Sequence, residues 1–186
     1  MKTKRIIAAV LALVCLSFAA CNEKSPADTP ANTTGGTAAV PGKTEGGTFP
    51  DLNATADAVK QYYGENVEFI FMADEYSDEV LQFTYGLMDG KFMDAVEDFV
   101  LTECDGMSAD TFAVVKFKAG TDKALVEEAA DIMKTEYVNG LKNKLAAYNP
   151  EEFAASDGYQ VKVYDDSVMM VISSKNTEAI IAAATK

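Results

Sequence analysis

The chain of 186 residues contains no histidine and no tryptophan. Without an imidazole side chain, every catalytic triad or dyad that uses histidine as its base is excluded. Without tryptophan, a domain of this size offers a poor stacking platform for sugar rings. The sequence also lacks a Ser-x-x-Lys motif and a glycine-rich phosphate-binding loop. These absences argue against the common classes of hydrolase and nucleotide-binding enzyme.

Cysteine is scarce as well, with Cys15, Cys21 and Cys104 the three that occur. Three thiols and no histidine are too few ligands for a structural zinc site. Cys104 stands between Glu103 and Asp105, whose negative charges raise the pKa of a thiol and so oppose its activation. We therefore interpret Cys104 as a buried or half-buried small residue.

Basic residues are few, because 16 Lys and Arg face 29 Asp and Glu, a net charge of −13. This balance excludes binding to a nucleic-acid backbone, which needs a basic surface. Residues 51–110 carry 15 acidic and two basic residues, whereas residues 111–186 are nearly balanced at −2. One face or end is predicted to be strongly negative. It is either a solvated surface or a patch that attracts cations or a basic partner.

The first 20 residues have the three parts of an export signal. Lys2, Lys4 and Arg5 precede an apolar run from Ile6 to Leu16, and small residues follow. The apolar run is shorter than the roughly 20 residues of a membrane-spanning helix. We therefore predict that residues 1–20 are a cleaved signal peptide and that the protein is exported.

The residues before Cys21 predict lipidation of its thiol. Phe18-Ala19-Ala20-Cys21 resembles a bacterial lipobox, with an apolar residue in place of the usual Leu. Ordinary signal peptidase, the alternative, prefers a small residue at −3, where Phe18 would lie. A diacylglycerol on Cys21, with palmitate-type chains, supplies two acyl chains, which is enough for stable membrane anchoring. The sequence thus predicts a lipoprotein on the extracytoplasmic face of the cell membrane. Its mature net charge is −16.

The segment after Cys21 is predicted to be a flexible linker. Residues 21–50 are rich in Pro, Gly, Thr, Ala and Ser, and they cannot bury enough apolar surface to offset the entropy of ordering. As a flexible coil the linker spans about 30 Å between its ends. Residues 51–186 are then long enough for one globular domain with its own core.

Hydrophobic periodicity and turn residues predict the elements of this domain. They are a helix capped by Asp51 and ending near Gly64, a strand or buried connection over Val67–Met72, a short helix from Ser77 to Gly86, a turn at Asp89-Gly90, strands Val96–Cys104 and Thr111–Lys118, a long helix Asp122–Ala147 with a bend at Asn139-Gly140 and a stop at Asn149-Pro150, a hairpin of Tyr159–Tyr164 with Val168–Ser173, and a last helix capped by Asn176 or Thr177.

The order of these elements predicts an α+β fold. Two strands followed by a helix occur twice, at residues 96–147 and again at residues 159–184. This order favours a four-stranded, mostly antiparallel sheet with helices packed on one face. Two short helices precede it.

Six short stretches occur in an order that resembles a known family: Asp51-Leu52, Tyr85-Gly86-Leu87, Ala113–Lys118, Tyr148–Phe153, Gly158–Val161 and Val168–Ser173. With the lipobox and linker, they resemble small bacterial lipoproteins built on a domain of unknown function, found mainly in Gram-positive anaerobes. The resemblance covers about residues 51–186. It implies the architecture and the lipidation, and it brings no activity, substrate or site.

One acidic cluster is the candidate for metal binding. Asp74, Glu75, Asp78 and Glu79 place four carboxylates within six residues, and hard cations such as calcium prefer oxygen ligands. The spacing does not match an EF-hand, because Tyr85 stands where the loop needs its last Glu. The cluster is therefore either a solvated helix start or the site of a cation-dependent binder or carboxylate-based hydrolase.

Aromatic residues are concentrated in the first half of the domain, at Tyr62, Tyr63, Phe69, Phe71, Tyr76, Phe83, Tyr85 and Phe92. They form either the core and its edge or an exposed patch that binds a peptide, a partner or an apolar ligand.

An anchor, a linker and a compact domain without a catalytic set predict a non-catalytic binding or interaction module. We expect no cofactor and no nucleic-acid partner. The membrane is the partner of the lipid, and the ligand is an envelope protein or a small molecule that the sequence does not identify.

Overall fold

The computed structural model describes residues 49–104, 108–173 and 176–186. The elements are α1 Leu52–Lys60, β1 Val67–Phe71, α2 Ser77–Glu79 with a π-helical turn Val80–Thr84, α3 Gly90–Ala95, β2 Val96–Cys104, β3 Thr111–Phe117, α4 Lys123–Ile132, a π-helical turn Met133–Tyr137, α5 Val138–Tyr148, α6 Pro150–Ala155 with a 3-10 turn Ser156–Gly158, β4 Gln160–Val163, β5 Ser167–Ile172 and α7 Thr177–Ala184. The signal peptide, Cys21, the linker up to residue 48 and the strand end at Asp105-Gly106 lie outside these residues.

The strands form one antiparallel sheet in the order β1-β2-β3-β5-β4. The mixed α/β class and the antiparallel pairing are as predicted, but the prediction of four strands is wrong. Val67–Phe71, which the sequence left open as a strand or a connection, pairs with β2 from Val67 opposite Cys104 to Phe71 opposite Val100. It is therefore the fifth strand and forms one edge of the sheet.

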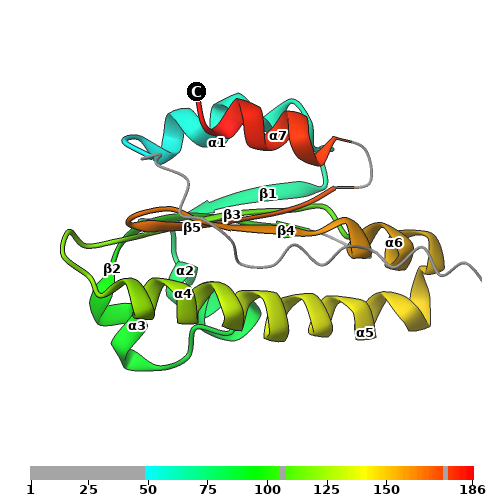
Figure 1. The fold of residues 1–186 in the computed structure, drawn as a ribbon. Coiled ribbons are helices and arrows are strands. Elements are labelled where there is room, and N and C mark those ends of the chain that lie inside the picture. The colour runs from blue at the N-terminus through cyan, green and yellow to red at the C-terminus, as the bar shows by residue number, and fades with distance from the viewer. Residues whose placement is uncertain (1–48, 105–107, 174–175) are drawn as a thin grey trace, which may run out of the picture. The chain divides into compact units, whose positions relative to one another are not determined.

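Helices cover both faces of the sheet, so the prediction that they pack on one face is also wrong. In Figure 1, α1 and α7 lie on one side of the strands and α3, α4 and α5 on the other. The physical reason is the composition of the inner strands. On β3, Phe112 and Val114 face one side while Ala113, Val115 and Phe117 face the other, and all five are fully buried. A strand that is apolar on both faces needs a layer on each.

The two layers enclose two separate hydrophobic cores. The larger core joins the strands to α4 and α5 through residues such as Val126, Met133 and Leu145. The smaller core lies under α1 and α7, which contribute Leu52, Ala56, Val59, Ile180, Ile181 and Ala184. Phe49 belongs to the smaller core and is 1% exposed, so the packing of the domain already includes the residue two positions before Asp51.

Side-chain caps define the starts of α1, α3, α4 and α6, as the sequence predicts for Asp51. The Asp51 carboxylate accepts hydrogen bonds from the backbone N–H groups of Asn53 and Ala54. Asp89 caps α3 by accepting from the N–H of Lys91. The predicted turn at Asp89-Gly90 is therefore the start of a helix. Asn176 is the N-cap residue of α7, as expected, but its side chain makes no capping hydrogen bond.

The long predicted helix is present, but its irregularity lies elsewhere. It runs as α4, the π-helical turn Met133–Tyr137 and α5, and the π-helical turn precedes the expected bend at Asn139-Gly140. Pro150 ends α5 as predicted and also begins α6 as its first residue. There its missing N–H costs nothing, and Asn149 provides the cap.

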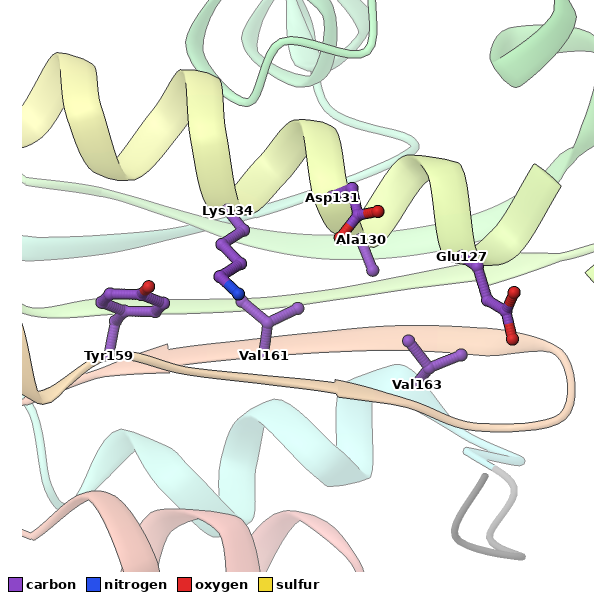
Figure 2. A pocket seen from close by; sticks show the side chains of 7 residues that line it. All are labelled: Glu127, Ala130, Asp131, Lys134, Tyr159, Val161 and Val163. Atoms are coloured by element: carbon purple, nitrogen blue, oxygen red, sulfur yellow. The ribbon is translucent and has the colours of Figure 1, made fainter. Parts of the chain in front are cut away.

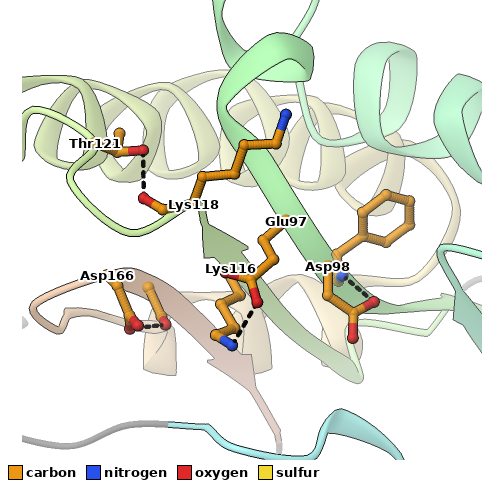
Figure 3. A network of polar contacts seen from close by, with 8 residues as sticks. Glu97, Asp98, Lys116, Lys118, Thr121 and Asp166 are labelled. Atoms are coloured by element: carbon orange, nitrogen blue, oxygen red, sulfur yellow. Dashed lines mark hydrogen bonds and ion pairs between the residues drawn. The ribbon is translucent and has the colours of Figure 1, made fainter.

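A polar network at one end of the sheet fixes the pairing of its central strands (Figure 3). A β-bulge at Glu97 shifts the register of β2 against β3, and the Glu97 carboxylate bonds the ammonium of Lys116 at 3.0 Å. This hydrogen bond raises the pKa of Lys116. The N–H of Phe117 donates to the carbonyl of Asp166 in the β4–β5 turn at 2.8 Å. The end of β3 is therefore held by both neighbouring hairpins.

Gly86 and Gly120 provide a matched test of packing behind the sheet, because both have φ near +85°. A Cβ at Gly86 would lie 2.9 Å from Cβ of Glu136 and 3.1 Å from Cγ2 of Ile132, whereas nothing lies within 4 Å of one at Gly120. Gly120→Ala is expected to cost about 1–2 kcal/mol for the left-handed backbone. Gly86→Ala is expected to cost a further 1–3 kcal/mol, approximately, for overpacking.

Urea denaturation of the two variants measures these differences. Equal losses of stability at the two positions would show that the segment around Gly86 does not pack against the long helix as described.

Candidate functional site

The candidate site is a groove between helix α4 and the edge strand β4 (Figure 2). Its volume is about 270 Å³, and its lining comes from seven residues: Glu127, Ala130, Asp131, Lys134, Tyr159, Val161 and Val163. An apolar pocket with a few convergent polar groups is the usual form of a ligand site.

The floor of the groove follows from the alternation of a strand. Tyr159 immediately precedes β4, and Val161 and Val163 lie two and four residues further on, so all three side chains point to the same face. They are half-buried and pack against the larger core. Because β4 ends the sheet on this side, their outer surfaces are not covered by a further strand within the described residues.

The opposite wall is one face of the long helix. Glu127, Ala130, Asp131 and Lys134 are spaced by three, four and seven residues, which places them in a row above the strand. Ala130 has a small side chain, and this leaves space between the two elements. Lys134 belongs to the π-helical turn that follows α4. Such turns are frequent at functional sites.

The rim of the groove carries three charges. The Glu127 carboxylate forms an ion pair with Lys123 of the same helix at 3.7 Å. Neither the Asp131 carboxylate nor the Lys134 ammonium has an ion-pair partner in the part of the chain that the structure describes. Both groups are therefore available to a ligand over an apolar floor.

The Tyr159 end of the groove is held by a second lysine. The Lys142 ammonium lies 5.7 Å from the centre of the Tyr159 ring and bonds the carboxylate of Asp157. A cation over an aromatic face is attracted by the ring's quadrupole, so this contact orients Tyr159.

The structure does not bring the predicted acidic candidates together as a metal site. Asp74, Glu75, Asp78 and Glu79 are all exposed, and a carboxylate oxygen of Asp74 accepts the backbone N–H of Phe71 at 2.7 Å. Within residues 49–104, 108–173 and 176–186, no group of three or more Cys, Asp or Glu side chains is placed to hold a metal ion. The described carboxylates at the start of α2 therefore act on the backbone or face solvent.

The aromatic residues divide between the two interpretations offered for them. Tyr85 and Phe92 are fully buried in the larger core, whereas Tyr63 and Phe69 meet each other edge-to-face and pack against the smaller core. Tyr76 and Phe83 are 68% and 71% exposed. Met72 and Met88 are also exposed, at 41% and 63%. The segment 72–88 thus presents apolar side chains to solvent among its acidic residues.

Cys104 is held as a neutral thiol. Its Sγ donates to the carbonyl of Asp110 at 2.9 Å, and burial, followed by the negative charge of Asp110, raises its pKa to about 11. The half-buried position of Cys104 and the direction of its pKa shift are as predicted, but the causes are burial and Asp110 rather than the adjacent acidic residues.

Nearby tyrosines are also kept neutral by burial. Burial raises the pKa of Tyr137 to about 12 and that of Tyr85 well above its usual range. The Tyr85 hydroxyl donates to the carbonyl of Thr102 at 2.8 Å, and its ring stacks on that of Tyr137. The Tyr137 hydroxyl lies 2.7 Å from that of Thr111. These contacts hold the π-helical turn Met133–Tyr137 and the segment before α3 against the ends of β2 and β3, which is a structural role.

The groove residues were not predicted as a site from the sequence. The spacing of Glu127, Asp131 and Lys134 and the alternation of Val161 with Val163 are both visible there. Each pattern identifies a face of its own element, but neither shows that α4 lies over β4. That depends on the strand order, which places β4 outside β5.

Comparison with known proteins gives one match. A family described as "Domain of unknown function (DUF4358)" matches residues 65–173. The matched stretch contains all five strands and the whole groove, and α1 and α7 lie outside it. No curated protein and no solved structure matches the chain. None of the helices in the described residues is both long enough and apolar enough for a membrane span.

The state of Cys104 predicts slow reaction with thiol reagents. With a pKa of about 11 in place of the ordinary 9, its thiolate population at pH 8 is about 100-fold lower. In a chain carrying Cys15→Ser and Cys21→Ser, native Cys104 is expected to react with iodoacetamide at least about 100-fold more slowly than in guanidinium. Mass spectrometry of timed samples gives both rates. Native labelling within a few-fold of the denatured rate would contradict the described environment.

Proposed function

The chain belongs to the DUF4358 family of domains of unknown function, and from this premise we propose that it is a lipid-anchored, extracytoplasmic binding module whose ligand occupies the groove between α4 and β4. The ligand is bound rather than transformed. The lipid anchor and an origin among Gram-positive anaerobes go beyond the family match and form part of the proposal.

The anchor is supported by residues 1–21 of the sequence. A basic start, an apolar run and Phe18-Ala19-Ala20-Cys21 together favour lipidation of Cys21 over cleavage by ordinary signal peptidase. Two acyl chains hold a protein stably at a membrane. A linker that spans about 30 Å would then hold the domain off the bilayer.

The open groove is the observation that carries the binding role. It combines an apolar floor, Val161 and Val163, with the charged groups of Asp131 and Lys134, which have no ion-pair partner in the described residues. Apolar contact supplies affinity in such a site, and a small number of placed polar groups supplies selectivity.

The state of the candidate nucleophiles supports binding over catalysis. The sequence contains no histidine, and burial raises the pKa of Cys104 and of Tyr137, so both stay protonated at neutral pH. A nucleophile or general base needs a pKa matched to the working pH. None of these side chains lines the groove.

The anchor is tested by Cys21→Ser in the full chain. Loss of the thiol is expected to abolish incorporation of labelled fatty acid and to move the protein from the membrane fraction to the soluble fraction. Cys104→Ser is the matched control and should leave both unchanged, because that thiol lies in the folded domain. Acyl labelling that persists in the Cys21 variant would remove the anchor from the proposal.

The groove is tested by photo-crosslinking in intact cells. A benzoylphenylalanine at Tyr159, an aromatic residue that lines the groove, is compared with one at Glu151, an exposed residue of α6 outside it. An adduct that survives denaturation is expected at position 159 and not at 151. Equal adducts at both positions, or none at either, would contradict binding in the groove.

A further inference from the structure

We propose that β4 binds an extended peptide as an added sixth strand, and that the peptide places a basic side chain against Asp131 and Glu127. This inference rests on the proposed function and names the ligand class for the same groove. Strand addition at a sheet edge, with pockets for alternate side chains, is a general mode of peptide recognition.

The backbone of β4 offers the required hydrogen bonds. The N–H of Tyr164 donates to the carbonyl of Ser167 at 2.8 Å and closes the β4–β5 turn. In an antiparallel ladder, every second residue is hydrogen-bonded to the neighbouring strand. Counting from Tyr164, the residues bonded to β5 are Lys162, opposite Met169, and Gln160, opposite Val171. The N–H and C=O groups of Val161 and Val163 therefore point away from β5, toward the open edge.

The same two residues also supply the floor of the groove. Val161 and Val163 direct their side chains toward α4 while their backbone groups face the edge. Residues of an added strand that lie beside them would point to the same side of the sheet. Every second side chain of the peptide would therefore enter the groove. The edge of β4 would bind the backbone of the peptide, and the groove would bind these side chains.

Charge selects the kind of peptide. Two carboxylates, those of Glu127 and Asp131, and one ammonium, that of Lys134, line the groove. Residues 111–186, which contain the groove, have a net charge of only −2, so the selection depends on these local carboxylates and not on the charge of the whole chain. A side chain of Lys or Arg that reaches Asp131 would give this carboxylate the partner that it lacks in the described residues.

The opposite edge of the sheet does not offer the same combination. One pocket beside β1 is lined by Glu65, Asn66, Glu68, Glu103 and Cys104, and another has Val67 and Phe69 in its floor. The backbone of β1 is what differs. The N–H of Val67 donates to the carbonyl of Gly64 at 3.1 Å, and the N–H of Phe71 donates to the carboxylate of Asp74 at 2.7 Å, so neither is available to an added strand. The edge at β1 is therefore the internal comparison for the edge at β4.

The test uses the purified chain and three synthetic peptides with blocked ends. The first is Thr-Val-Thr-Lys-Thr-Val-Thr, which presents Val, Lys and Val on one face of a strand. The second has Glu in place of Lys, and the third carries N-methyl groups on its five inner backbone amides, which removes the peptide's hydrogen-bond donors to the edge. Fluorescence anisotropy at low salt is expected to show binding of the first peptide, with the other two bound at least about fivefold more weakly.

Two pairs of variants examine the two parts of the proposal. Val161→Pro removes an N–H that points away from β5, so the β4–β5 ladder stays intact, and it is expected to weaken peptide binding at least about fivefold. Val161→Thr keeps that N–H and should bind nearly as the parent chain does. Glu127→Gln with Asp131→Asn should lose the preference for Lys over Glu, whereas Glu151→Gln should keep it. Circular dichroism confirms that each variant is folded.

Hydrogen exchange locates the bound peptide. Protection of the Val161 and Val163 amides, without protection in β1, is expected. Protection elsewhere, equal binding of the Glu peptide, or binding that survives Val161→Pro would overturn the inference. Protection of the same amides by a second copy of the chain without peptide would also overturn it. If the crosslinker at Tyr159 gives an adduct in cells but the purified chain does not bind the peptide, this inference ends and the proposed function stands. If neither the adduct nor the peptide binding is seen, both end.

Discussion

The central strand β3 has apolar side chains on both of its faces, and this requires a layer of helices on each side of the sheet. Phe112 and Val114 need the cover of α1 and α7, and Ala113, Val115 and Phe117 need the cover of the long helix. At about 25 cal/mol per Å² of apolar surface, exposure of either face would cost more than a domain of this size can lose. The helices α1 and α7 lie together on one face of the sheet and cover it jointly.

A sheet whose faces are buried can meet a ligand mainly at its edges. The long helix covers β5 but leaves space beside β4, because Ala130 is small where the helix passes over the strand. The core below the groove, with Val126, Ala129 and Met133 fixed against the strands, holds the helix at that height. Packing in the core thus sets the width of the groove. The charged residues of its rim lie on the solvent side of the same helix.

The sequence was sufficient for most of the elements, because their signals are local. Asp51 as a cap, β2 from Val96 to Cys104, and the stop at Pro150 each depend on a few adjacent residues. The number of helical layers also had a local signal. The unbroken apolar run Phe112–Val115 is typical of a strand buried on both faces, whereas the order of the elements favours a sheet covered on one face.

The groove required information that no single segment contains. Which strand lies at the edge, and which helix passes over it, depends on β5 pairing with β3 and β4 with β5. The π-helical turn at Met133–Tyr137 is likewise invisible in the spacing of apolar residues, although it sets the position of Lys134. The location of the groove depends on pairing between strands that are distant in the sequence, and hydrophobic periodicity does not predict this pairing.

The packing of Phe49 also has a mechanical consequence. This residue is 1% exposed, and its ring meets that of Tyr164 edge-to-face, with centroids 5.0 Å apart. Tyr164 directly follows β4 and closes the β4–β5 turn. Tension applied through the preceding chain would therefore enter the folded domain at this aromatic pair, next to the strand that borders the groove. A force on the chain before Phe49 and the position of the edge strand β4 are therefore coupled through these two rings.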